Sequence, residues 1–172
     1  MINDRIDGSG WLADARRVLS PNCDARPADC AIELVVVHAI SLPPGRFGGG
    51  EIEALFTNQL DLNADPYFAT IAGLRVSAHC VVRRDGELVQ FVSLASRAWH
   101  AGVSRWGTRE RCNDFSIGIE LEGTDDGAFE SAQYDQLARL IATLRTAYPI
   151  RAVLAHSDIA PGRKADPGVG FD

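Results

Sequence analysis

The stretch 156-HSDIAPGRKADPG-168 holds the side chains best suited to chemistry: His156, Asp158, Arg163, Lys164 and Asp166. Its two prolines and two glycines predict a loop, because neither residue favours a regular helix. Exposed charge pairs contribute little to stability. Loops held at both ends by a rigid scaffold, by contrast, often carry binding and catalytic residues. The stretch is therefore a candidate functional loop.

Two histidines are predicted to meet at the ends of strands. His38 ends a run of β-branched residues, and His156 directly follows another strand-like run. Side chains at strand ends emerge along one edge of a sheet. Asp166 follows ten residues after His156, with Pro161 and Gly162 between them to turn the chain back. Two imidazoles and one carboxylate suit zinc with an open position for water, although scattered polar residues can also be unrelated.

Other titratable residues allow both a structural and a catalytic interpretation. Glu120 lies on the polar face of an alternating run and could accept a proton from a metal-bound water. Alternation alone favours a solvated strand carboxylate. Arg163 and Lys164 are candidate oxyanion stabilisers or ordinary surface cations. His79 and His100 compete as ligands; His79 is better interpreted as a half-buried strand histidine with satisfied hydrogen bonds, and His100 as a residue lining a pocket.

A mixed sheet with a few helices is expected to position these residues. Hydrophobic patterning predicts strands at 33–41, 76–82, 87–92, 116–122 and 151–155, and helices at 11–18, 51–60 and 131–148. Asp85-Gly86 between two of the strands predicts a hairpin, and Ser131 is expected to cap the longest helix. Residues 1–30 are otherwise irregular. We predict a single α/β (α+β) domain over 1–172, with a central mixed sheet flanked by helices.

Composition excludes several classes of function. The net charge of -6, with 17 Lys and Arg against 23 Asp and Glu, argues against binding to nucleic acid or anionic lipid. No apolar run approaches the ~18 residues of a membrane span, and none near the N-terminus has signal-peptide length, so a cytoplasmic protein is expected. The four cysteines form no CxxC pair, and Cys80 is interpreted as a buried free thiol.

Six motifs covering most of the chain carry a family resemblance. They are LVVVHAISLPPGRFGG, DPYF, LRVSAHCVVRRDGELVQFV, RAWHAGVS, RERCNDFSIGIELEGTD and HSDIAPGRKADPG. In that order they resemble the AmpD-type 1,6-anhydro-N-acetylmuramoyl-L-alanine amidases. These belong to a wider zinc amidase family that includes phage amidases and peptidoglycan recognition proteins.

The resemblance implies a fold, a metal and a reaction. It implies a mixed sheet flanked by helices, with Zn²⁺ held in a groove at the sheet edge by His38, His156 and Asp166. Glu120 would be the proton acceptor, and Lys164 would stabilise the transition state. The implied reaction is cytoplasmic cleavage of the amide between anhydro-muramic acid and L-alanine during peptidoglycan recycling, which indirectly limits β-lactamase induction.

The resemblance also suggests residues that contact the substrate. Arg75, Arg109 and Arg163 are candidates for the anionic peptide, and Trp99 for packing against the sugar. One position departs from the family: Ala39 stands where relatives usually have Asn, so an amide hydrogen bond next to a ligand is missing.

The muropeptide is the only partner that we expect, and the chain is expected to act as a monomer. Two rival functions are a lytic amidase acting on intact cell wall, which would need export, and a non-catalytic muropeptide-binding module. The complete set of ligand and catalytic residues argues against the second.

Overall fold

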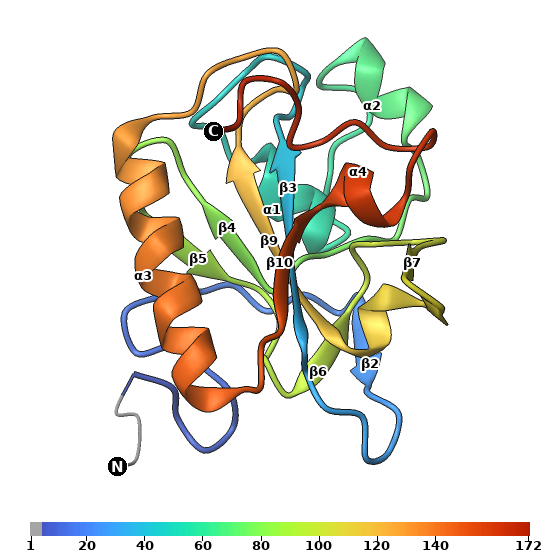
Figure 1. The fold of residues 1–172 in the computed structure, drawn as a ribbon. Helices are drawn as coiled ribbons and strands as arrows, with labels where there is room; N and C mark the ends of the chain where they lie inside the picture. Colours follow the sequence, from blue (N-terminus) through green and yellow to red (C-terminus); the bar gives the residue numbers. More distant parts are fainter. Residues whose placement is uncertain (1–4) are drawn as a thin grey trace.

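The two longest strands of the main sheet are neighbours inside it and consist largely of buried residues. The structure, a computed structural model, describes residues 5–172. Strand β3 (Leu34–Ile40) begins with four buried aliphatic residues, and every residue of β9 (Ser116–Glu122) is buried. Such continuous burial is typical of parallel strands covered on both faces. The remaining elements are arranged around this pair (Figure 1).

The main sheet has six strands in the order β1-β5-β4-β9-β3-β10. All neighbours are parallel except β4 and β5, which form the hairpin predicted around Asp85-Gly86. The other strands of this sheet are β1 (Arg16–Arg17), β4 (Cys80–Val82), β5 (Leu88–Gln90) and β10 (Ala152–Ala155). Two small antiparallel pairs lie outside it, β2 (Cys23–Ala25) with β6 (Ser96–Ala98), and β7 (Arg105–Trp106) with β8 (Arg109–Glu110).

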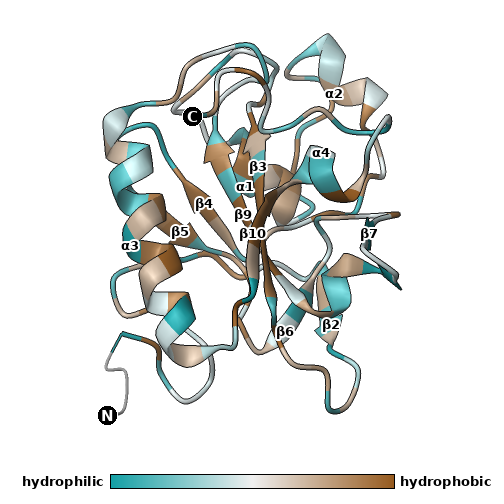
Figure 2. Cartoon of the chain, in the orientation of Figure 1, coloured by the Kyte–Doolittle hydropathy of each residue, from teal (hydrophilic) through white to brown (hydrophobic). Residues whose placement is uncertain are grey.

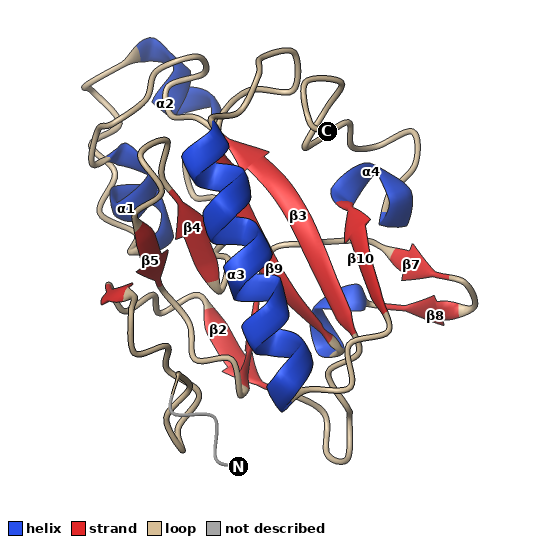
Figure 3. Ribbon diagram, turned by 60° about the vertical axis from the view of Figure 1, so that its left-hand side comes forward, coloured by secondary structure: helices blue, strands red, loops and turns tan. Residues whose placement is uncertain are grey.

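Helix α3 (Ser131–Ala147) covers one face of the sheet, as Figure 3 shows. Its buried residues Leu137, Leu140 and Leu144 belong to the same apolar cluster as alternate residues of β3 and β9. The colouring in Figure 2 shows the corresponding pattern, with apolar strands beneath a helix that is polar on its outer side. Burial of this apolar surface is the main force that holds the layers together.

The opposite face is covered by shorter elements. Helix α1 (Glu51–Phe56) packs Ile52, Leu55 and Phe56 into a second apolar cluster. The other short elements are α2 (Pro66–Thr70), the 3-10 helix η1 (Cys112–Asp114) and α4 (His156–Ile159). The predicted single α/β domain with a central mixed sheet is confirmed. No helix among residues 5–172 is long and apolar enough to cross a membrane.

Three local predictions are wrong. Residues 11–18 form turns and strand β1 instead of a helix, because backbone pairing with β5 and a hydrogen bond from Leu12 N to Gln90 Oε1 (2.7 Å) satisfy the chain there. The residue that caps α3 is Glu130, one before Ser131, and its N–H donates to Gln133 Oε1. The candidate loop begins with one helical turn, α4.

The strand predicted at 116–122 occurs with those bounds, and the other predicted strands and helices, apart from the helix at 11–18, occur with shorter ones. The strand expected at 76–82 covers only Cys80–Val82, and the helix expected at 51–60 ends at Phe56. Cys80 is a buried free thiol, as predicted. The structure shows no disulfide among the four cysteines, all of which are described.

Candidate metal centre and cleft

The sheet register brings His38 and His156 together. Ala155 pairs with Val37 in the parallel β10–β3 ladder, so His156 and His38 are the next residues on neighbouring strands. His156 is the first residue of α4, directly after β10, and His38 lies two residues before the carboxyl end of β3. Figure 1 shows α4 at the carboxyl end of β10. The two rings contact each other with centroids 4.3 Å apart. The strand-end reasoning from the sequence therefore predicted their meeting correctly.

The loop after α4 returns Asp166 to the same place. Ser157 N donates to the backbone oxygen of Asp166 (3.1 Å), and Lys164 N donates to the backbone oxygen of Ala160 (3.0 Å). Asp158 does not reach the centre; its carboxylate accepts from Ala155 N and holds the first turn of α4. Figure 1 shows the chain passing back over the strand ends after α4.

Three electron-pair donors converge at this point. His38 Nδ1 and His156 Nδ1 are 2.9 Å apart, and Asp166 Oδ2 lies 3.2 Å from the first and 3.0 Å from the second. His156 Nε2 is 3.1 Å from the backbone oxygen of Ala101, which can only accept, so this nitrogen carries the proton and Nδ1 has its lone pair free. A cation bound between the three atoms would satisfy them all. This donor set fits zinc.

Electrostatics keep the cluster in the form that binds cations. Burial lowers the pKa of His38 to about 4, so its imidazole is neutral near pH 7. Burial tends to raise the pKa of Asp166, but hydrogen bonds to His156 and His38 outweigh it and hold that pKa well below its usual value. A neutral His38 imidazole and the Asp166 carboxylate are therefore available together near pH 7.

Glu120 faces the same centre from the neighbouring strand. It pairs with His38 in the β3–β9 register, and residues paired in this way point to the same face of the sheet. Its side chain is buried, and Oε2 has no hydrogen-bond partner. Burial, followed by the charge of Asp166, raises the pKa of Glu120 well above 4.5, while Lys164 acts in the opposite direction. Alternation alone favoured a solvated carboxylate for Glu120, and that interpretation is wrong because the side chain is buried.

Glu122, two residues further along the same face, differs sharply. It is also buried, but its Oε1 accepts from Arg83 Nη1 (3.0 Å) and from Gly48 N (2.7 Å). Those bonds connect β9 to the loop before α1 and to the β4–β5 turn, which is a structural role. A buried carboxylate that keeps an unpartnered oxygen is costly, so Glu120 is the carboxylate of this strand that stands out as a candidate for chemistry.

A cleft of about 720 Å³ opens over these residues. One part of its wall is polar and includes the three converging side chains, Glu120, His100 and the exposed Lys164. The other part is apolar and comes from the β3–α1 loop, α1 and the α2 region, including Leu42, Phe56 and Ile71. The cleft thus combines a reactive end with a surface suited to an apolar or ring-shaped group.

The predicted substrate contacts are not gathered in this cleft. Arg109 forms an ion pair with Glu33, and Arg163 Nη2 donates to the backbone oxygens of Ala101 and Val103 (2.7 Å each). The Trp99 side chain donates a hydrogen bond to the carboxylate of Asp24. Hydrogen bonds from Arg97, which have the larger effect, and from Trp99 lower the pKa of Asp24.

Arg75 is exposed, and it lies beside Leu74 and Val76, which line the cleft, although it does not line the cleft itself. Of the three predicted arginines, Arg75 is therefore the one whose neighbours on both sides in the sequence line the cleft.

The two remaining histidines have different roles. His79, expected to be half-buried, is completely buried; its Nδ1 accepts from Gly118 N (3.0 Å), and burial lowers its pKa to about 3. His100 lines the cleft as predicted, and its Nδ1 also lies 2.9 Å from His38 Nε2. That second contact gave no signal in the sequence, because it depends on the path of an irregular segment.

The chain matches known proteins over most of its length. A family model described as N-acetylmuramoyl-L-alanine amidase matches residues 28–169. A protein of Citrobacter freundii named 1,6-anhydro-N-acetylmuramyl-L-alanine amidase AmpD is 63% identical over 165 residues, which is 95% of this chain and 88% of the relative.

Solved structures show the same similarity. A crystal structure of a selenomethionine AmpD derivative superposes with a TM-score of 0.94 at 62% identity, covering 97% of this chain and 94% of that one. The Escherichia coli amidase AmiD, solved with the substrate anhydro-N-acetylmuramic acid-L-Ala-D-γ-Glu-L-Lys, has a TM-score of 0.60 at 30% identity, covering 97% of this chain and 62% of that one.

Proposed function

The chain belongs to the N-acetylmuramoyl-L-alanine amidase family, and from this premise we propose a zinc-dependent mechanism for hydrolysis of the amide between 1,6-anhydro-N-acetylmuramic acid and L-alanine. The relatives that resemble it over nearly their full length are named for this reaction. One observation of the structure carries the proposal: His38, His156 and Asp166 converge in a cleft that also contains Glu120 with an unpartnered buried oxygen.

The proposed metal is Zn²⁺, held by His38 Nδ1, His156 Nδ1 and one carboxylate oxygen of Asp166. When bound in such a site, zinc lowers the pKa of a water ligand to about 7 and polarises a carbonyl group. The three residues would supply three of the four ligands that zinc usually takes. The neutral state of His38 and the low pKa of Asp166 both favour a bound cation near neutral pH.

Glu120 is proposed as the residue that moves the proton. As the attacking water forms a bond to the amide carbon, Glu120 takes one of its protons. When the C–N bond breaks, the same carboxyl group gives that proton to the departing amine of L-alanine. A raised pKa suits both steps, since the group must accept a proton and then release it.

Lys164 is proposed to stabilise the negative charge that develops on the amide oxygen. It lines the cleft on the loop between α4 and Asp166, and its charge acts on both His38 and Glu120. A donor of this kind contributes about 3–4 kcal/mol in comparable reactions. The apolar wall would then take the sugar, and Arg75 the carboxylates of the peptide.

The proposed setting is cytoplasmic recycling of peptidoglycan fragments, with indirect limitation of β-lactamase induction. The solved substrate complex of AmiD contains an anhydro-muramyl peptide, which supports a ligand of this class for the present cleft. The experiment compares anhydro-muramyl tripeptide, the same peptide on N-acetylmuramic acid, and intact cell wall. Release of free tripeptide from the first substrate is the expected result; cleavage of intact wall alone would instead identify a lytic amidase.

A further inference from the structure

We infer that His100 and Ala101 form a positioning segment that fixes which nitrogen each metal-binding histidine presents. The inference rests on the proposed function, because it assumes a metal at His38 and His156. An imidazole binds a metal through one nitrogen, and the partner of the other nitrogen sets its orientation and protonation. In this protein two consecutive residues contact the nitrogens that do not face the metal site: His100 contacts His38 Nε2, and Ala101 contacts His156 Nε2.

The contact with His38 goes through an imidazole. His38 Nε2 lies 2.9 Å from His100 Nδ1, and His100 Nε2 lies 3.1 Å from Ser116 Oγ. With a cation on His38 Nδ1, the proton must be on Nε2, which then donates to His100 Nδ1. The remaining proton of His100 is on its own Nε2 and points to Ser116 Oγ. Each imidazole N–H of His38 and His100 therefore has an acceptor.

The contact with His156 goes through the backbone. His156 Nε2 donates to the backbone oxygen of Ala101 at 3.1 Å. The same oxygen accepts from Arg163 Nη2 at 2.7 Å, which anchors the candidate loop to this segment. Arg163, first considered as a substrate contact, therefore has a place in this support.

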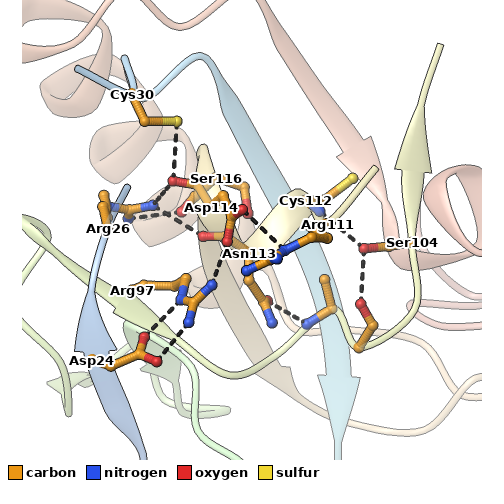
Figure 4. A network of polar contacts seen from close by, with 12 residues as sticks. Asp24, Arg26, Cys30, Arg97, Ser104, Arg111, Cys112, Asn113, Asp114 and Ser116 are labelled. Atoms are coloured by element: carbon orange, nitrogen blue, oxygen red, sulfur yellow. Dashed lines mark hydrogen bonds and ion pairs between the residues drawn. The ribbon is translucent and has the colours of Figure 1, made fainter. Parts of the chain in front are cut away.

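Asn113 holds the segment from behind. Its Oδ1 accepts from the backbone N–H groups of both His100 (3.2 Å) and Ala101 (2.8 Å). Figure 4 shows Asn113 and Ser116 within a network of polar contacts around η1 and the start of β9. In that network Arg26 Nη2 donates to the backbone oxygen of Ser116 (2.8 Å) and Arg97 pairs with Asp114 (2.5 Å). Asn113, which holds the segment, thus lies among several further polar contacts.

Gly118 provides the space for the imidazole of His100. A Cβ atom at this position would collide with the ring, because the nearest atoms to it would be His100 Cγ, Cδ2 and Nδ1. Gly118 lies on the face of β9 that also carries Ser116 and Glu120. The strand therefore leaves room for His100 between Ser116 on β9 and His38 on the neighbouring β3.

The test uses three variants of His100 that separate hydrogen bonding from packing. His100→Asn keeps an acceptor near the position of Nδ1, facing His38, but is smaller. His100→Gln is closer to histidine in size and, in the same rotamer, reaches only toward Ser116. His100→Leu removes both polar contacts. The zinc dissociation constant of each full-length protein is measured by competition with a chromophoric chelator, and the melting temperature of each metal-free protein is recorded beside it.

The inference predicts that His100→Asn binds zinc within about threefold of the unmodified protein. His100→Gln and His100→Leu should bind roughly ten- to a hundredfold more weakly, which is typical when such a partner is lost. Equal affinities in all proteins, or better binding by His100→Gln than by His100→Asn, would show that the ring only fills space. The Asn and Gln pair decides even where His100→Leu does not fold. Absence of zinc binding by the unmodified protein would instead refute the proposed metal and, with it, this inference.

Discussion

Glu120→Gln should produce a protein that is more stable but nearly inactive. Glu120 is buried, its Oε2 has no hydrogen-bond partner, and the negative charge of Asp166 acts on it. Glutamine has almost the same shape but no charge and cannot accept the proton of the attacking water. The substitution therefore removes the proposed function of the residue without creating a cavity.

The expected sizes follow from this environment. Leaving a buried polar group unpaired costs about 1–3 kcal/mol, and more when the group is charged. Because the glutamine amide is also left partly unpaired, we expect a gain in unfolding free energy of about 1 kcal/mol in the metal-free protein. For a chain of this length that corresponds to an increase in melting temperature of about 2–4 °C. Loss of a general base lowers kcat by about 10²–10⁴-fold.

The gain in stability should depend on pH in a defined direction. Burial raises the pKa of Glu120 in the folded protein well above its usual 4.5. Below that value the carboxyl group is protonated in both folded and unfolded chains, so it causes no penalty. As pH rises above 4.5, the unfolded chain releases the proton first and the folded state loses stability. The advantage of Glu120→Gln should therefore be absent near pH 4 and complete once the folded group has ionised.

The assay measures melting temperatures of the chelator-treated proteins from pH 4 to pH 8, together with zinc content and kcat on anhydro-muramyl tripeptide. The expected combination is unchanged zinc content, a strongly reduced kcat and a pH-dependent gain in melting temperature. A Glu122→Gln variant is the matched control, since Glu122 is buried but paired with Arg83 and should lose stability. Loss of zinc from Glu120→Gln, or a lower melting temperature at pH 8, would refute the assigned role.

Three further substitutions test separate parts of the account. Lys164→Met should lower kcat by about 10²–10³-fold with zinc content unchanged, since it removes one donor to the oxyanion; a change in KM alone would contradict this. Ala39→Asn should raise kcat/KM a few-fold, because the new amide would add one net hydrogen bond of about 0.5–1.5 kcal/mol to the substrate. Equal or lower efficiency would exclude a substrate contact at this cleft position. Asn113→Ala should weaken zinc binding more than Asn113→Asp, which keeps the acceptor for two backbone N–H groups; similar losses would point to a general structural effect.

The core of the fold was predictable from the sequence because its apolar side chains pack mainly against other apolar side chains. The continuous apolar run that became β3 indicated a buried strand, and the position of His38 toward its carboxyl end follows from that. The failure at residues 11–18 has the opposite cause. Their weak helical pattern was overridden by pairing with β5, some seventy residues away in the sequence, which no local signal reveals.

The surroundings of the site were less predictable than its members. Alternation placed Glu120 on the correct face of β9 but suggested solvent, whereas the loop carrying Lys164 and Asp166 returns close to that face and Glu120 is buried. The part played by His100 depends on how residues 99–101 cross β9, and an irregular segment has no periodicity from which to infer its path. The family resemblance suggested Arg109 as a substrate contact. Its ion pair with Glu33 depends on the β7–β8 hairpin, which the sequence did not predict.

The central claim is that one zinc ion, held by His38, His156 and Asp166, is required for cleavage of an anhydro-muramyl amide. The most direct measurement titrates Zn²⁺ into the metal-free protein while release of tripeptide from anhydro-muramyl tripeptide is followed. Activity should be absent at the start, rise linearly and reach a plateau at about one equivalent, because the described residues contain a single such group of ligands. Full activity in the metal-free protein, or a plateau reached only at two or more equivalents, would contradict the account.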